Sequence, residues 1–362
     1  LYSLGASMNV YCGERTSMVR LSGLERNLEE SLRLMELRFG SPRTAPDTLK
    51  DMIKVQIGAH KDNKVNPSYV SYALGEWAQR GKESRVLQEL SDEELKGLDE
   101  SALKDLLRTY FSFKRRVGYV GSRSGEEVLR LLTSSDRKYS EPPARRPLVY
   151  RRPAADEAFF THRDMVQSQI GLFAADEKYD PASAVDYGFY ADYMGGGMSA
   201  VIFQEVREAR SMAYAASGGY MTAAYKGEEN VLWGRVGTQA DKTLDAASLI
   251  KDLLTRMPAA ADRFKAAKRS IEERYRTSPV EFRSVAGALF AWEDLGLSGD
   301  PRPERFKRSL SYTLDELTRF AARFEKMPKT VYILGNRERV DPGSLKKLGT
   351  VTEKPLDELF PY

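Results

Sequence analysis

One stretch of the sequence, residues 193–220, combines residue types that could do chemistry. Arg207 and Tyr214 lie seven positions apart across the end of a segment with helical periodicity. A guanidinium has five fixed hydrogen-bond donors and a phenol adds a neutral one, so the pair could bind a carbonyl or stabilise a developing oxyanion. By pattern alone, an arginine at a helix end is usually solvated or ion-paired, and a tyrosine that opens a strand is usually part of a core.

A run of three glycines, Gly195, Gly196 and Gly197, precedes this helical segment. Glycine permits sharp turns and close approach of the backbone to a ligand, which makes the run a candidate substrate-binding loop. The run matches neither the phosphate-binding loop nor the dinucleotide-binding fingerprint. A flexible turn is the more common reason for such a run.

The histidines argue against a local metal site. The chain has two, His60 and His162, and they are too far apart in sequence for a short-spaced zinc motif such as H-x-x-E-H or H-E-x-x-H. The single Cys12 excludes internal disulfides and cysteine-rich zinc sites. We therefore assign no metal ligand in this chain, and we expect each histidine to be a surface or satisfied core residue.

The composition is that of an ordinary globular protein. The 362 residues are 41% hydrophobic and 30% charged, which excludes disordered and collagen-like chains and allows about two domains of ~100–200 residues. The net charge of +4 is spread among interleaved charges, so nucleic acid is not expected as a partner. No uncharged hydrophobic stretch reaches the ~18–20 residues of a spanning helix. We expect a soluble protein of the bacterial periplasm or cytoplasm.

The elements of the first part of the chain begin with a β-hairpin. Residues 8–21 alternate around a turn at 13–15, and Ser22 with Glu25 has the spacing of a helix capping box. Leu24, Leu28, Leu32 and Met35 then line one face of the predicted helix. Further helices are predicted at 45–60, 67–80, 91–96 and 99–111, followed by a strand at 116–120.

The second part shows a similar order of elements. We predict strands at 166–175, 214–225, 230–238 and 329–335, and helices at 181–193, 199–210, 241–254, 260–276, 279–296 and 314–326. A proline-rich stretch at 136–153 is typical of a connection between two domains. The repeated order predicts domains at 1–144 and 145–362.

These patterns predict an α+β fold of two tandem related domains, each a mainly antiparallel sheet with helices packed on one face. In the second domain, about sixty residues precede the strand pair and have no counterpart in the first. We therefore expect the first domain to be truncated at its N-terminus, with its missing strands supplied by another polypeptide.

Two stretches resemble a known family. YMGGGMSAVIFQEVREARSMAYAASGGY is similar to the glycine-rich loop, helix and R-E-x-R-x-x-A-Y stretch of the pitrilysin/insulinase family of zinc metallopeptidases, the inverzincins with H-x-x-E-H. LGASMNVYCGERTSMVRLSGLERNLEESLRLM resembles the segment shortly downstream of that family's zinc motif. The resemblance covers essentially the whole chain.

The resemblance implies a clam-shaped peptidase whose two halves, each of two related domains, enclose a chamber. Zinc lies in the first half, and the second half supplies an arginine and a tyrosine that contact the substrate carbonyl. In this sequence they match Arg207 and Tyr214, with Arg210 as the nearest wrong assignment. The three glycines match the family's glycine-rich loop.

The resemblance also implies which half this is. Gln56 occupies the position of the family's third zinc ligand, a glutamate, and no carboxylate occurs between Met52 and Lys61. A neutral amide is a poor zinc ligand. We therefore expect a non-catalytic C-terminal half that is inactive alone and has no cofactor of its own. Its partner would carry zinc and H-x-x-E-H, and the pair would cleave peptides.

Two alternatives stay open at this point. Such a chain could be a catalytically silent structural or assembly subunit, as family members in respiratory complexes are. It could also be a peptide-binding module with no coupled chemistry. The partner's sequence and peptide cleavage by the assembled pair distinguish the three hypotheses.

Overall fold

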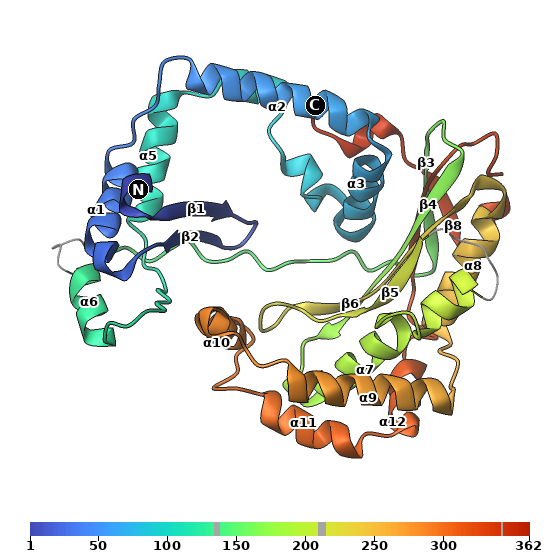
Figure 1. The fold of residues 1–362 in the computed structure, drawn as a ribbon. Helices are drawn as coiled ribbons and strands as arrows, with labels where there is room; N and C mark the ends of the chain where they lie inside the picture. Colours follow the sequence, from blue (N-terminus) through green and yellow to red (C-terminus); the bar gives the residue numbers. More distant parts are fainter. Residues whose placement is uncertain (134–137, 209–214, 342) are drawn as a thin grey trace. The chain divides into compact units, whose positions relative to one another are not determined.

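The computed structural model describes residues 1–133, 138–208, 215–341 and 343–362 (Figure 1). The chain forms two compact units. Unit 1 comprises Leu1–Gly58, Asp92–Pro147 and Phe282–Gly287, and unit 2 comprises Ala59–Ser91, Leu148–Glu281 and Ala288–Tyr362. The chain passes from unit 1 to unit 2 at residues 147–148, within the proline-rich stretch. The predicted division into tandem domains at 145 stays a prediction.

Unit 1 is built around the predicted hairpin. Strands β1 (Ser7–Cys12) and β2 (Ser17–Ser22) pair antiparallel, with Ser7 opposite Ser22. The rings of Phe39 and Phe111 stack with centroids 4.3 Å apart and join two of the helices. The helices of this unit are α1 (Leu28–Gly40), the first part of α2 (Thr48–Val65), α4 (Asp92–Lys96), α5 (Glu100–Phe111) and α6 (Gly125–Thr133).

Two local predictions in unit 1 are wrong. Ser22 ends strand β2 and does not cap a helix, because a 3-10 turn at Glu25–Asn27 separates it from α1. Glu25 instead accepts a hydrogen bond from the Tyr119 hydroxyl and forms an ion pair with Arg123. Residues 116–120 form no strand, since no described strand pairs with them. Helix α6 was not predicted.

Unit 2 contains a six-stranded mixed sheet in the order β5-β6-β4-β7-β3-β8. All neighbouring pairs are antiparallel except β3 with β7 and β3 with β8, which confirms the prediction of an antiparallel-dominated α+β fold. Strands β3 and β8 were not predicted. The strands are β3 (Glu157–His162), β4 (Gln167–Lys178), β5 (Ala215–Met221), β6 (Glu229–Gln239), β7 (Thr330–Gly335) and β8 (Thr350–Glu353).

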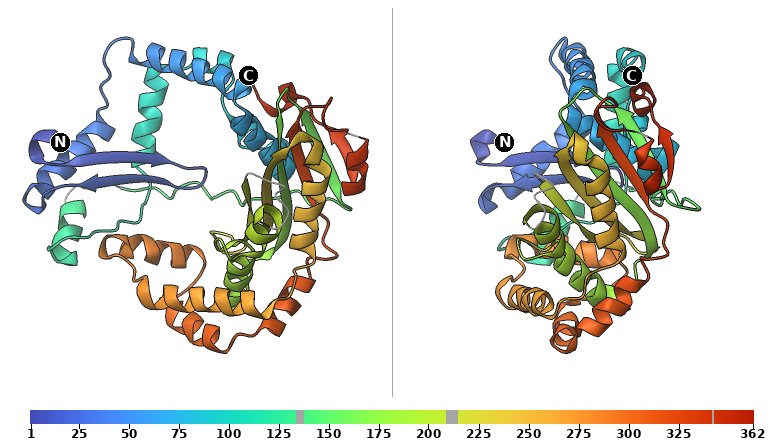
Figure 2. Two further views of the ribbon diagram at one scale, coloured as in Figure 1. Left: turned by 45° about the vertical axis from the view of Figure 1, so that its right-hand side comes forward. Right: turned by 90° about the vertical axis from the view of Figure 1, so that its right-hand side faces the viewer.

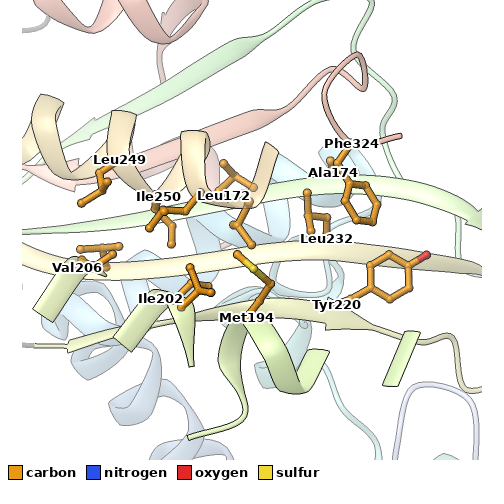
Figure 3. Packing of buried hydrophobic residues seen from close by; sticks show 14 of the residues in the cluster. Leu172, Ala174, Met194, Ile202, Val206, Tyr220, Leu232, Leu249, Ile250 and Phe324 are labelled. Carbon is orange, nitrogen blue, oxygen red and sulfur yellow. The ribbon is translucent and has the colours of Figure 1, made fainter. Parts of the chain in front are cut away.

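A large hydrophobic core covers one face of this sheet (Figure 3). Leu172 of β4 and Leu232 of β6 are almost completely buried there, against Ile250 of α8 and other helical residues. The helices of unit 2 that follow the sheet strands are α7 (Ala184–Gly195), α8 (Thr243–Thr255), α9 (Ala261–Thr277), α11 (Arg302–Ser311) and α12 (Leu314–Ala322). Helix α11 was not predicted. Within helix α10 (Val285–Asp294) the chain passes from unit 1 to unit 2, between Gly287 and Ala288.

The opposite face of the sheet is covered by helix α3 (Pro67–Arg80), which comes from the first part of the sequence (Figures 1 and 2). Its Leu74 is fully buried with Phe173 of β4 and Tyr332 of β7. Strands β4 and β7 carry apolar side chains on both faces, so both faces need cover. The prediction named helices on one face, and α3 adds this second layer. None of the helices in the described ranges is long and apolar enough to cross a membrane.

Candidate functional site

The predicted glycine-rich loop lies at the end of α7. Gly195 is the last residue of this helix, and the N–H of Gly196 donates to the carbonyl of Asp192 at 2.8 Å. Gly197 has a φ of +129°, a conformation that L side chains rarely adopt. A Cβ on Gly195 would collide with the carbonyl oxygen of Gly218 in β5. Close packing thus explains Gly195, and the positive φ explains Gly197. The assignment of the three glycines to substrate binding stays a prediction.

The segment after the loop is helical, as predicted for 199–210, up to the last described residue. It contains a π-helix at Phe203–Glu208, a rare form that occurs frequently at functional sites. Arg207 belongs to this π-helix, and its side chain lies outside what the structure describes. Tyr214 and Arg210 lie outside the described residues. The pairing of Arg207 with Tyr214 therefore stays a prediction.

The two ends of this segment are anchored to the same core. Ile202 and Val206 are buried in the cluster that Figure 3 shows, together with Met194 of α7. Glu205 forms an ion pair with Arg263 of α9, with 2.6 Å between the Oε1 and Nη2 atoms. At the other end, β5 begins directly after residue 214 and packs against α7. The described residues on both sides of residues 209–214 thus pack on one scaffold.

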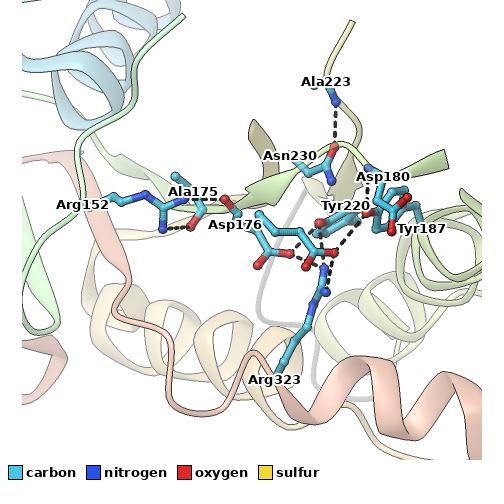
Figure 4. Close-up of polar contacts among 10 residues, drawn as sticks. Arg152, Ala175, Asp176, Asp180, Tyr187, Tyr220, Ala223, Asn230 and Arg323 are labelled. Carbon is cyan, nitrogen blue, oxygen red and sulfur yellow. Dashed lines mark hydrogen bonds and ion pairs between the residues drawn. The ribbon is translucent and has the colours of Figure 1, made fainter. Parts of the chain in front are cut away.

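A cluster of polar side chains joins β5 to this scaffold, and sequence reasoning did not find it (Figure 4). The Tyr220 hydroxyl donates to Asp176 Oδ2 at 2.5 Å, and Arg323 Nη2 donates both to Asp176 and to the Tyr220 oxygen, at 3.0 Å from the latter. Arg323 Nη1 donates to Glu177 Oε1 at 2.7 Å. The Tyr187 hydroxyl donates to the same Glu177 oxygen at 3.0 Å. We call these five residues the Arg323 cluster.

A β-bulge in β4 allows both carboxylates to take part. Consecutive residues of a regular strand point to opposite faces, yet Asp176 and Glu177 both bind Arg323. The pairing of β4 with β6 shifts between Ala175 and Lys178, which places both acidic residues within the irregularity. The two adjacent acidic residues at the end of an apolar strand could have been noticed in the sequence. Their arginine partner could not have been predicted, because it lies on an element far away in sequence.

Burial and charge set the protonation states of the Arg323 cluster. Burial, and next the hydrogen bond to Asp176, raises the pKa of Tyr220, while burial raises the pKa of Tyr187 to about 12. Burial alone would lower the pKa of Arg323, but the hydrogen bond to Glu177 and the charge of Asp176 outweigh it and raise the pKa. At neutral pH both phenols are therefore protonated donors, and the guanidinium is charged.

An open pocket of about 390 Å³ adjoins the Arg323 cluster. Its carboxylates already have partners, because Asp186 accepts a hydrogen bond from Tyr312 at 2.6 Å and Glu316 pairs with Arg308 and caps α12. These contacts join helices of unit 2. The lining residues are Asp186, Glu316, Arg319, Phe320 and Arg323.

Candidate metal ligands do not gather in the parts of the chain that the structure describes, where no group of three or more His, Cys, Asp or Glu side chains could hold an ion. Gln56 is exposed on α2. His60 is buried and stacks on Tyr362 with ring centroids 3.6 Å apart. His162 is exposed, and its Nδ1 accepts from the N–H of Arg337 at 3.1 Å. The described residues thus do not fit a zinc ion.

Several solved structures of peptidases and proteases have a fold similar to that of this chain. A peptidase M16 inactive domain from Pseudomonas fluorescens superposes with a TM-score of 0.71 at 16% identity, over 92% of this chain and 82% of that one. The periplasmic protease PqqL from Escherichia coli gives 0.70 at 12% identity over 92% of this chain and 38% of PqqL. A protease from Helicobacter pylori gives 0.67 at 16% identity over 92% and 83%.

Sequence comparison adds no relative, since no family model and no curated protein matches the chain. At these identities the structural likeness shows the fold. This chain has the mixed sheet and packed helices of the M16 inactive-domain fold over nearly its whole length.

Proposed function

We propose that this chain is the non-catalytic half of a zinc-dependent metalloendopeptidase of the pitrilysin/insulinase family. The observation that carries the proposal is the fold shared with a peptidase M16 inactive domain over 92% of this chain. The sequence of residues 193–220, which resembles that family's glycine-rich loop and R-E-x-R-x-x-A-Y stretch, supports it independently.

In this proposal, residues 1–144 form an inactive peptidase-like domain and residues 145–362 the C-terminal peptidase-like domain. Both contribute to the wall of a chamber that a partner half closes. The partner carries the H-x-x-E-H segment and the zinc ion, which supplies the polarisation of the scissile carbonyl and the activation of water. This chain alone is inactive.

The chemical contribution of this chain is a pair of hydrogen-bond donors. The Arg207 guanidinium and the Tyr214 hydroxyl donate to the substrate carbonyl oxygen as negative charge develops on it. Gly195, Gly196 and Gly197 let the peptide approach the backbone. The π-helix that contains Arg207 supports this assignment, because π-helical turns are rare and occur frequently at functional sites. Loss of one oxyanion donor lowers kcat by about 10²–10³-fold.

The test is Arg207→Ala in the enzyme assembled from both halves. We expect kcat for a peptide substrate to fall by about 10²-fold or more, because a donor that acts in the transition state is lost. Arg210→Ala removes the same side chain three positions away on the same segment, and it should leave kcat within about threefold of the unmodified enzyme. Removal of zinc from the assembled enzyme with a chelator should abolish cleavage.

Two results would overturn the proposal. Near-normal turnover of Arg207→Ala would remove the donor role. A partner whose matching segment lacks H-x-x-E-H, with no peptide cleaved by the pair, would favour the alternative of a catalytically silent structural or assembly subunit.

A further inference from the structure

The Arg323 cluster has no place in the proposed chemistry, although it is attached to the strand that leaves the proposed site. Tyr220 is the sixth residue of β5, and β5 begins directly after Tyr214. The cluster holds β5 to the bulge of β4 and to Arg323, the C-cap residue of α12. Because β6 separates β5 from β4 in the sheet, this link is additional to the ladder between neighbouring strands.

Strand β5 needs such a link. It is an edge strand, so only β6 pairs with it in the described sheet. Its interior contains Gly218 and Gly219, and glycine weakens a strand because it adds backbone freedom and has no side chain to pack. Of its remaining side chains, Ala215, Ser217 and Met221 are exposed, whereas Tyr220 is 5% exposed. Apart from the small and partly buried Ala216, Tyr220 is therefore the side chain that attaches β5 to the core.

The opposite end of the segment is fixed by close packing. Gly195, where α7 ends, lies against the carbonyl of Gly218, two residues before Tyr220. The chain before residue 196 and strand β5 after residue 214 are thus in close contact, at Gly195 and Gly218. A shift of catalytic donors by about 1 Å can cost about 10²-fold in rate.

We infer that Asp176, Tyr220 and Arg323 form a positioning unit that fixes β5 and thereby holds Arg207 and Tyr214 in the arrangement needed for the transition state. This inference rests on the proposed function. None of the three residues contacts substrate in it, and they act through the backbone of β5. The rings of Tyr187, Tyr190, Phe320 and Phe324 surround the Tyr220 ring and keep it in the core, while the hydrogen bonds of its hydroxyl with Asp176 and Arg323 fix its position there.

The first test is Tyr220→Phe in the enzyme assembled from both halves, because this change removes the hydroxyl and keeps the ring. We expect kcat to fall about tenfold with KM within about twofold. Asp176→Asn should have a similar effect. Arg323→Lys keeps the charge but cannot donate as a planar fork to two carboxylates and a phenol at once, so it should also lower kcat.

The matched control is Tyr312→Phe. Tyr312 is also buried, its hydroxyl donates to a carboxylate, Asp186, at 2.6 Å, and its ring packs against Phe189 and Phe264. Tyr312→Phe therefore removes a hydrogen bond from a buried phenol to a carboxylate, as Tyr220→Phe does, but this bond does not involve β5. We expect both phenylalanine variants to show similar losses of thermal stability, with the decrease in kcat confined to Tyr220→Phe. Equal kcat values for the two variants would overturn the inference.

A combined variant separates positioning from a general structural effect. If Tyr220 acts through the donors, Tyr220→Phe should lower kcat by less than twofold in a background that lacks both donors, Arg207→Ala with Tyr214→Phe. A full tenfold decrease in both backgrounds would contradict the inference while leaving the proposed function intact. Normal turnover of Arg207→Ala alone would instead contradict the proposed function, so the two failures are distinguishable.

Discussion

The two units of the chain contain similar residue types but bury them very differently. Unit 2 covers both faces of a six-stranded sheet, and its core includes large side chains such as Tyr190, Leu232 and Phe324 at 0% exposure. Unit 1 has a two-stranded sheet, and Leu106 and Leu129 are more than half exposed. Its buried residues, among those described, are Ser31, Phe39, Leu95, Phe111 and Val128.

This difference matters because the hydrophobic effect scales with the apolar area removed from water. A two-stranded sheet buries too little to be stable without further packing, whereas a sheet covered on both faces can hold a loop in a fixed position. The segment with Arg207 starts and ends in unit 2. The residues proposed to act on a substrate are thus attached to the better-packed unit, which can hold them in a more precise geometry.

The largest effect should come from deleting core atoms of unit 2. We expect Leu232→Ala to lower the free energy of unfolding by about 3 kcal/mol, since Leu232 is fully buried between the sheet and its helices. Leu106→Ala makes the same change at a side chain that is 65% exposed in unit 1, and it should change stability by less than about 0.5 kcal/mol. Urea unfolding of both variants is the measurement.

Tryptophan fluorescence assigns such a transition to one unit. The three tryptophans, Trp77, Trp233 and Trp292, all belong to unit 2, so their emission reports its unfolding, while far-ultraviolet circular dichroism follows both units. Leu232→Ala should therefore shift the fluorescence midpoint. Equal losses of stability for the two leucine variants would contradict the prediction, because they would mean that Leu106 is as well buried in solution as Leu232.

A second contrast concerns ion pairs. Glu76 of unit 2 is 3% exposed and bonds Arg85, with 2.6 Å between Oε1 and Nη2, while Arg80 lies 3.5 Å away. Glu76→Gln should lower the free energy of unfolding by about 3 kcal/mol at pH 7, because the buried guanidinium of Arg80 loses its counter-charge. Glu30→Gln removes a carboxylate from an exposed pair with Arg33 in unit 1 and should give no measurable change.

The effect of Glu76 should depend on pH with a definite sign. Burial alone would raise the pKa of Glu76, but its hydrogen bond to Arg85 and the charges of Arg80 and Arg85 outweigh this and lower the pKa below the usual 4.5. A carboxyl with a lowered folded-state pKa stabilises the fold above about pH 4.5, and this contribution is lost as the pH falls through the folded-state value. The gap between Glu76→Gln and the unmodified chain should narrow below pH 4.5. A gap that is constant from pH 7 to pH 3 would contradict this ion pair.

The same contrast explains which parts of the fold could be predicted from sequence. Periodicity predicted the hairpin, the helix α3 and the strand β4 because each pattern is local. It missed β3 and β8, and it predicted a strand at 116–120 that does not form, since a strand exists only with a partner that local pattern does not specify. The cover of the second sheet face by α3 is likewise a long-range fact.

The candidate site divides in the same way. Arg207, Tyr214 and the three glycines were found because a family motif places them within one stretch. The Arg323 cluster was missed because its members come from four separate elements, and a bulge turns Asp176 and Glu177 to the same partner. No spacing rule connects residues 176, 220 and 323. Contacts of this kind become visible only in three dimensions.

The smallest of the three effects on stability comes from replacing glycine by alanine, which should destabilise the fold at one position and stabilise it at two others. Gly195→Ala should lower the free energy of unfolding by about 2 kcal/mol, because its Cβ would meet the backbone carbonyl of Gly218. Gly188 in the same helix α7, and Gly58 at the end of the first segment of unit 1, have open space where an alanine Cβ would lie, with no atom within 4 Å. Alanine at either should instead raise stability by about 0.5–1 kcal/mol, since it lowers the entropy of the unfolded chain.

Thermal unfolding of the three alanine variants is the measurement. A loss at position 195 with gains at 188 and 58 would mean that glycine at the end of α7 serves close packing, whether or not it also contacts a substrate. A gain at all three would show that α7 and β5 are less closely packed than their contact implies. The segment that carries Arg207 would then lack a fixed starting point, and the positioning role of Tyr220 would depend on the Arg323 cluster alone.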